Sequence, residues 1–202
     1  MNRQEQKSPE YVRISRASAL SIGLISGWMY KSAVNRCVNL LLQYPEGCFA
    51  NCAYCGLARH RPFKYEDKSF IHVDWPVFHL DLIIDGINKA PGYVKRSCIS
   101  MITHKRAFED TCVILERLKA HTKLPVSVLV SPTVLMDGNI ERLKGFGADK
   151  IGVAIDLANQ VLFDQYRGKG VKGPHRWERY WKTFEDALLI FGYKNVGIHL
   201  MV

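Results

Sequence analysis

Three cysteines stand close together in the segment EGCFANCAYCGLARHR, residues 46–61. Cys48, Cys52 and Cys55 have the spacing C-x3-C-x2-C, which lets their thiolates converge on one metal centre. A four-iron cubane held by three cysteines keeps one iron open for a further ligand, and an open iron is a catalytic position. A zinc site is the alternative, in which His60 would complete a tetrahedron with the same cysteines. The spacing alone leaves both metals open.

The elements that must position these cysteines are those of an α/β fold. Five apolar, β-rich runs alternate with segments of helical period, which is the pattern of βα units around a parallel sheet. The predicted strands are 38–44, 94–101, 125–131, 150–156 and 195–202, and the predicted helices are 75–89, 107–121, 136–146, 160–166 and 177–191. The apolar segment at 17–30 predicts a further helix, buried or docked, before the first strand.

The predicted strands have two different faces. In the strand at 150–156 every second residue from Ile151 to Ile155 is branched and apolar, whereas the intervening positions are small or polar. A TIM barrel proper fills its interior with bulky side chains, so we expect a wider or partly open version, with its site at the carboxyl ends of the strands. The polar residues at or near those ends are Ser100, Ser131, Asp156 and His199.

Composition excludes several classes of protein. The chain has 202 residues with 48% hydrophobic content, enough to bury a core as one soluble globular domain. Its net charge of +9 is spread without a run of like charges, so we expect an acidic partner or substrate and no nucleic acid. The segment at 17–30 is shorter than the about 20 apolar residues that span a bilayer, so no membrane partner is expected. Six unevenly spaced cysteines do not resemble a secreted disulfide framework, which favours a cytoplasmic location.

The motif CFANCAYC resembles the C-x3-C-x-aromatic-C signature of the radical S-adenosylmethionine (radical SAM) superfamily. That superfamily places its signature after the first strand of a partial (β/α)6 barrel, as this sequence does. The resemblance covers the chain from about Val38 onward, because strand spacing and motif position agree together.

The resemblance implies that Cys48, Cys52 and Cys55 bind a [4Fe-4S] cluster whose fourth iron is chelated by the amino and carboxylate groups of S-adenosyl-L-methionine. Tyr54 matches the aromatic position that packs near the adenine. Reduction by a donor such as ferredoxin or flavodoxin would split the sulfonium, and the resulting 5′-deoxyadenosyl radical would take a hydrogen atom from an unactivated carbon. The barrel would shield and aim that radical.

Further cofactor contacts are implied at the strand ends. The family often has a Gly-Gly-Glu-like motif after the second strand, but this sequence has SMITHKRAFED there, and Ser100, Thr103 or His104 are the candidate substitutes. Asp156 and Arg167 are placed to hold ribose or carboxylate groups; alternatively, Asp156 caps the next helix and Arg167 is a solvated charge. The candidate cofactor contacts are Tyr54, Ser100, Ser131, Asp156 and Arg167.

The other cysteines are candidates for a second cluster. Cys98 is predicted on the lumen face of the second strand, where a biotin synthase-like enzyme carries a ligand for its sulfur-donating cluster. The third strand has no cysteine, and Cys112 lies in an apolar helical stripe, where free cysteine is often a small buried hydrophobe. We therefore expect no second cluster unless further sequence or a partner supplies ligands.

Within the superfamily the chain resembles the biotin synthase and lipoyl synthase-like branch. The segments CAYCGLARHRP, CISMITHKRAFEDTC and RGKGVKGPHRWERYW look most like the two-protein type of lipoyl synthase, which inserts sulfur into a protein-bound octanoyl chain. This implies a lipoyl carrier domain and a second radical SAM subunit as partners. The alternatives are another radical reaction on a small-molecule substrate, namely a biotin-like sulfur insertion or a carbon-skeleton rearrangement, and a zinc-stabilised binding module.

These expectations divide the chain into two parts. Residues 1–36 are expected to form an N-terminal helical extension, and residues 37–202 a radical SAM partial barrel. The chain stops at GIHLMV, within the fifth predicted strand, so we expect a barrel that is truncated there and a longer native protein.

Overall fold

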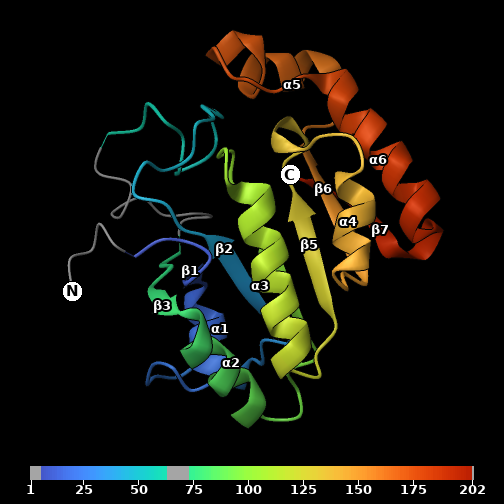
Figure 1. Cartoon of the computed structure of the whole chain (residues 1–202). Coiled ribbons are helices and arrows are strands. Elements are labelled where there is room, and N and C mark those ends of the chain that lie inside the picture. Colours follow the sequence, from blue (N-terminus) through green and yellow to red (C-terminus); the bar gives the residue numbers. More distant parts are fainter. Residues whose placement is uncertain (1–5, 63–72, 202) are drawn as a thin grey trace.

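The computed structural model describes residues 6–62 and 73–201, and its strands form one seven-stranded sheet (Figure 1). The strands are β1 (Tyr11–Ile14), β2 (Cys37–Leu42), β3 (Val77–His79), β4 (Arg96–Ser100), β5 (Val126–Val130), β6 (Lys150–Asp156) and β7 (Val196–Leu200). Their order in the sheet is β3-β1-β2-β4-β5-β6-β7. β1 is antiparallel to β2 and β3, whereas β2, β4, β5, β6 and β7 are mutually parallel. The predicted α/β fold with a mainly parallel sheet is confirmed.

The sheet does not close on itself in the described part of the chain. β3 and β7 lie at its two edges, and no pairing joins them among the described residues. The sequence predicts a partial TIM-type barrel; the structure shows the parallel sheet but does not confirm a barrel.

The helices are α1 (Arg16–Ser21), α2 (Leu80–Lys89), α3 (Ala107–His121), α4 (Asn139–Gly145), α5 (Gln160–Tyr166) and α6 (Trp177–Phe191). α3 packs on β5 and α6 packs on β6 and β7, while α4 lies beside α6 (Figure 1). α3, α5, α6 and β6 have the predicted bounds. Among the described residues, the model contains no helix with the length and apolar character that a membrane crossing requires.

The two faces of the parallel strands differ as the alternation predicted. Ile151, Val153 and Ile155 of β6 are 2%, 0% and 0% exposed, and they belong to the hydrophobic core under the helices. Each such burial contributes roughly 1.5–3 kcal/mol. Gly152 and Ala154 are half-buried on the other face, and a Cβ at Gly152 would lie 3.0 Å from Leu129 Cδ1. The helices therefore cover the branched face, and the small side chains leave room on the opposite face.

The N-terminal segment differs from the expected helical extension. The first described element is a strand, β1, which pairs with β2 in the register Val12↔Leu42. The helix expected at 17–30 is only the six-residue α1, capped by the Ser15 hydroxyl, which accepts from the Ser18 amide. It ends before Gly23, whose φ of +74° is left-handed and stops a helix. The segment before β2 thus extends the same sheet.

The predicted helix at 75–89 also starts later than expected. Residues Val77–His79 form β3 and pair with β1, so α2 begins only at Leu80. The His79 ring accepts from the Asp81 amide and caps the helix. The sequence does not reveal the short strand β3, because the apolar side chains of Val77 and Phe78 continue the helical period.

Candidate functional site

The cysteine loop follows β2 and is held by hydrogen bonds from distant segments. The Phe49 amide donates to the Thr103 carbonyl, and the Ala53 amide donates to the Tyr166 carbonyl at the end of α5, both at 2.8 Å. In Figure 1 the loop and α5 lie at the end of the sheet toward which β5 points. The loop therefore sits at the carboxyl ends of the parallel strands.

The three thiols of this loop line one cavity. Cys48, Cys52 and Cys55 are all part of the wall of a cavity of about 280 Å³, hereafter the cysteine cavity. Cys52 is 7% exposed and the other two are half-buried. The Cys55 amide donates to the Cys52 carbonyl at 3.1 Å, which turns the chain between these two cysteines.

The thiols of Cys52 and Cys55 are protonated at neutral pH when nothing is bound. Burial raises the pKa of Cys52 to about 11, against the positive charge of Arg167, which lowers it. Burial also raises the pKa of Cys55. Because a metal ligand must be the thiolate, metal binding here would release protons and is favoured by higher pH.

The donor set fits an iron–sulfur cluster better than the zinc alternative. His60 is exposed and does not line the cysteine cavity, so the structure does not bring the fourth zinc ligand to the three thiols. Over residues 6–62 and 73–201, no three His, Cys, Asp or Glu side chains, the three loop cysteines included, form a group that could hold a metal ion. Three thiols on one cavity wall suit a multi-iron group in which each thiolate binds its own iron.

Asp156 also lines the cysteine cavity and is the centre of a polar network there. It ends β6 at an irregularity in the pairing with β7, and its φ of +67° is left-handed. Its carboxylate accepts from the Tyr54 hydroxyl at 2.8 Å and forms an ion pair with Arg167. The alternative role as a helix cap does not hold, because the side chain of Asn159 caps α5 by accepting from the Leu162 amide.

His199 of β7 completes the contacts of Asp156. The distance from His199 Nδ1 to Asp156 Oδ1 is 2.8 Å. Burial, followed by the positive charge of Arg167, lowers the pKa of His199, so the ring is neutral near pH 7. Nδ1 therefore donates to the carboxylate, and Nε2 is left as an acceptor.

Arg167 is not a solvated charge, since it is 5% exposed. Its guanidinium donates to the hydroxyls of Tyr54 at 3.0 Å and Tyr180 at 3.1 Å, in addition to the Asp156 pair. Its charged carbon also lies 4.9 Å from the centre of the Tyr180 ring. A buried charge with these partners holds α5, α6 and the cysteine loop in one arrangement.

A glycine-rich turn, residues 168–173, brings Arg167 to this position. A Cβ at Gly170 would lie 2.7 Å from the Gln165 carbonyl oxygen, and one at Gly173 would overlap the carbonyl oxygen of Arg167. The turn thus needs glycine for close backbone approach. Asn51 Nδ2 donates to the Val171 carbonyl at 2.9 Å and ties the turn to the cysteine loop.

The hydroxyl residues predicted at the strand ends also reach the cysteine cavity. Ser100, Thr103 and Ser131 line it, and Thr103 Oγ1 is 3.2 Å from Ser131 Oγ. His104 is different: it stacks on Tyr44 with ring centroids 3.8 Å apart and is not part of the cavity wall. Of the proposed substitutes, Ser100 and Thr103 are thus the ones at the cavity.

Two residues of the site were missed by sequence reasoning, His175 and Tyr180. His175 lines the cysteine cavity, and its Nδ1 lies 2.8 Å from the Tyr180 hydroxyl and 2.6 Å from Thr133 Oγ1. Both lie in the segment RGKGVKGPHRWERYW, which was noted only for its resemblance. A histidine directly after a glycine-rich turn was the signal that could have found the first of them.

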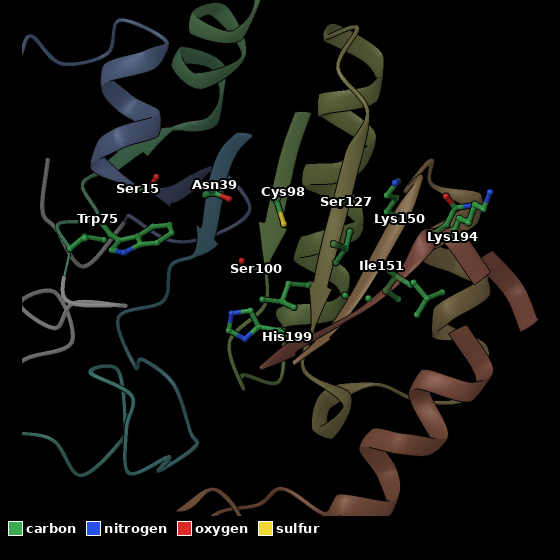
Figure 2. A pocket seen from close by; sticks show the side chains of 17 residues that line it. Ser15, Asn39, Trp75, Cys98, Ser100, Ser127, Lys150, Ile151, Lys194 and His199 are labelled. Carbon is green, nitrogen blue, oxygen red and sulfur yellow. The ribbon is translucent and has the colours of Figure 1, made fainter. Parts of the chain in front are cut away.

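A second cavity, hereafter the sheet cavity, lies on the small-residue face of the strands (Figure 2). Its volume is about 650 Å³. Figure 2 shows Asn39, Cys98 and Ser127 on neighbouring strands along its wall. Ser100, Leu129 and His199 line both this cavity and the cysteine cavity, so the two adjoin.

Of the remaining cysteines, Cys98 lies on the strand face that the alternation predicted, and Cys37 is the first residue of β2. Cys98 lines the sheet cavity, where burial raises its pKa and a hydrogen bond with Ser127 lowers it. Cys112 is 2% exposed in the core side of α3 and lines neither cavity described here. Cys37 lies near Cys98, and burial raises its pKa to about 12.

Comparison with known proteins assigns no family to this chain. No protein-family model matches it, and a search of curated proteins finds no significant match.

Proposed function

We propose that this chain is a radical SAM enzyme with the active site in the cysteine cavity. The observation that supports this most is that the three thiols of the C-x3-C-x2-C loop share one cavity with the linked side chains of Tyr54, Asp156 and Arg167. Residues about a hundred positions apart in the chain come into contact there. A cluster on the thiols and an organic ligand against the polar network would touch each other.

The thiols would hold the inorganic group. Cys48, Cys52 and Cys55 would be the ligands of a [4Fe-4S] cluster. When bound, this group supplies the electron that cleaves S-adenosyl-L-methionine to methionine and the 5′-deoxyadenosyl radical. Arg167 stabilises the thiolate form of Cys52, because its positive charge lowers that thiol's pKa.

The polar network would hold the ligand. Tyr54 offers a ring at the position that packs near adenine in the family it resembles, and its hydroxyl is fixed by Asp156 and Arg167. The Asp156 carboxylate has lone pairs left to accept a ribose hydroxyl, and Ser100 and Ser131 offer hydroxyls on the same wall. Because Ser131, Asp156 and Arg167 are at most 8% exposed, this wall also keeps water from a radical.

For the substrate we propose an octanoyl chain on a lipoyl carrier domain, into which sulfur is inserted within a partial (β/α)6 barrel. The sheet cavity adjoins the cysteine cavity, and its volume falls within the about 300–1,000 Å³ typical of ligand pockets. Leu129 and Val196 give it apolar wall for an acyl chain. The net charge of +9 suits an acidic carrier domain. A second radical SAM subunit and a ferredoxin- or flavodoxin-type reductant complete the proposed system.

A radical reaction on a small molecule is the second candidate. Lys150 and Lys194 also line the sheet cavity (Figure 2). Two ammonium groups there would suit a small substrate with an anionic end, as in a biotin-like sulfur insertion or a carbon-skeleton rearrangement, whereas an octanoyl amide has no charge to pair with them.

Anaerobic reconstitution with iron and sulfide tests the class of protein. We expect a brown protein with about four irons per chain. Cys48→Ala, Cys52→Ala and Cys55→Ala should each lose the cluster, whereas Cys112→Ala, a core change outside the described cavities, should keep it. A colourless wild-type protein that holds zinc tightly would contradict the proposal and support a zinc-stabilised binding module.

A further inference from the structure

Two buried nitrogen atoms in the wall of the cysteine cavity have no hydrogen-bond partner. They are Arg167 Nε and His175 Nε2. Residue Arg167 is 5% exposed and residue His175 is 1% exposed. Two other unpartnered atoms among the described residues, Ser97 Oγ and His104 Nε2, belong to residues outside this wall. Since buried polar groups are almost always hydrogen-bonded, the first pair calls for a hydrogen-bond partner that the described residues do not supply.

The hydrogen-bond chain around His175 accommodates a neutral ring that carries its proton on Nε2. Arg167 can only donate, so the Tyr180 hydroxyl oxygen accepts from it at 3.1 Å. The nearest atom for the Tyr180 hydroxyl proton is then His175 Nδ1, at 2.8 Å. With Nδ1 as the acceptor, the neutral ring carries its proton on Nε2. In that tautomer, in which Nδ1 accepts from the Tyr180 hydroxyl or from Thr133 Oγ1 at 2.6 Å, the atom without a partner is an N–H donor.

The His175 ring remains neutral across the pH range in which the protein would work. Burial, with the positive charges of Arg167 and Arg176, lowers the pKa of His175 to about 2. His175 therefore contributes a directed hydrogen bond without a charge.

We propose that His175 Nε2 donates a hydrogen bond to an acceptor atom of the S-adenosylmethionine in the cysteine cavity, with Arg167 Nε as a second donor. This inference rests on the proposed function. It makes His175 a ligand-binding residue that selects an acceptor on the ligand at this wall. The acceptor belongs either to the adenosine half or to the methionine half, and each half has oxygens or nitrogens of the required kind.

A matched pair of substitutions separates this role from a structural one. Glutamine places its amide nitrogen near the position of Nε2. Asparagine reaches only the position of Nδ1, so it removes the hydrogen-bond donor at the Nε2 position. We expect His175→Asn to weaken S-adenosylmethionine binding about tenfold and His175→Gln to stay within about threefold of wild type. The measurement is titration calorimetry on the anaerobically reconstituted full chain, with iron content and the visible absorption of the cluster recorded for each protein.

Adenosine and L-methionine, titrated separately, identify the half that His175 contacts. A weaker interaction of His175→Asn with either half supports the inference, and equal affinity of wild type and His175→Asn for S-adenosylmethionine overturns it. Equal loss in both variants would also overturn it, since that result indicates a structural role. A wild-type protein that carries its cluster but binds no S-adenosylmethionine would overturn the proposed function, and this inference with it.

Discussion

The Tyr54 hydroxyl donates a 2.8 Å hydrogen bond to the Asp156 carboxylate, although 102 positions separate the two residues in the chain. The contact joins the cysteine loop after β2 to the end of β6. Arg167 contacts both side chains, so a charge and a hydroxyl hold the loop against the sheet. This link couples the stability of the fold to the shape of the cysteine cavity.

Asp156→Asn tests that coupling. The substitution removes the negative charge and leaves the Arg167 charge buried and unpaired, which should lower the free energy of unfolding by about 3 kcal/mol. Asp156→Ala should cost about 1 kcal/mol more, because alanine tolerates the φ of +67° less well than asparagine. Urea unfolding is the measurement, and Glu116→Gln on the exposed side of α3 is the control, expected within 0.5 kcal/mol of wild type. Equal stability of Asp156→Asn and the control would contradict the network.

Gly173→Ala tests the glycine-rich turn. The new Cβ would overlap the Arg167 carbonyl oxygen, so the turn must shift and carry Arg167 with it. We expect a loss of about 1–3 kcal/mol, measured by thermal unfolding. Gly145→Ala in α4 meets nothing within 4 Å and should be neutral or slightly stabilising. An unchanged melting temperature for Gly173→Ala would show that the turn does not need glycine.

The stability of the protein should fall as the pH falls below about 6.5. His175 has a pKa of about 2 in the fold against 6.5 in the unfolded chain, so the unfolded chain binds more protons below pH 6.5. The stabilisation that neutral His175 contributes is present above pH 6.5 and is lost as the pH drops. The free energy of unfolding should fall by about 2 kcal/mol between pH 7 and pH 5. Urea unfolding at both pH values should show this loss in wild type and a smaller one in His175→Gln. Identical losses in the two proteins would show that His175 does not titrate on unfolding.

The parallel part of the fold was readable from the sequence, because its signals are local. β6 alternates branched and small residues over its whole length, and α3 and α6 have clear helical periods, so their bounds were predicted correctly. β1 was missed because it is four residues long and contains Arg13, which looks exposed in sequence but is 2% exposed and donates to Gln43 at 2.6 Å. Short antiparallel strands depend on partners that the local sequence does not show.

The sequence predicts those site residues that strand direction alone brings together. Asp156 and Ser131 end neighbouring parallel strands, whose carboxyl ends meet at one edge of a sheet, so their proximity follows from topology. His175 reaches the same cavity only through the close backbone approach of the glycine-rich turn, and Tyr180 joins the site by its contacts with Arg167 and His175. That approach depends on contacts among distant backbone atoms, which no periodic pattern encodes.

The substrate proposal is tested by its effect on turnover. With the proposed partner subunit present, we expect an octanoyl-lysine peptide or an octanoylated carrier domain to increase 5′-deoxyadenosine formation and to yield a thiolated acyl product. Mass spectrometry under anaerobic reducing conditions detects both. Stimulation by a small anionic molecule instead, lost in a Lys150→Met, Lys194→Met double variant, would favour the second candidate. No response to the octanoyl substrate, with or without the partner, would remove the lipoyl proposal and leave the radical chemistry untouched.

Reductive cleavage of S-adenosylmethionine by the reconstituted chain tests the central claim most directly. Wild type and Cys112→Ala are incubated anaerobically with S-adenosylmethionine and dithionite beside Cys48→Ala, Cys52→Ala and Cys55→Ala, and 5′-deoxyadenosine is quantified by mass spectrometry. We expect 5′-deoxyadenosine from the first two proteins and none above background from the three loop variants, because each loop thiolate would hold its own iron. Equal 5′-deoxyadenosine from a loop variant and wild type, or none from a wild type that contains about four irons per chain, would contradict it.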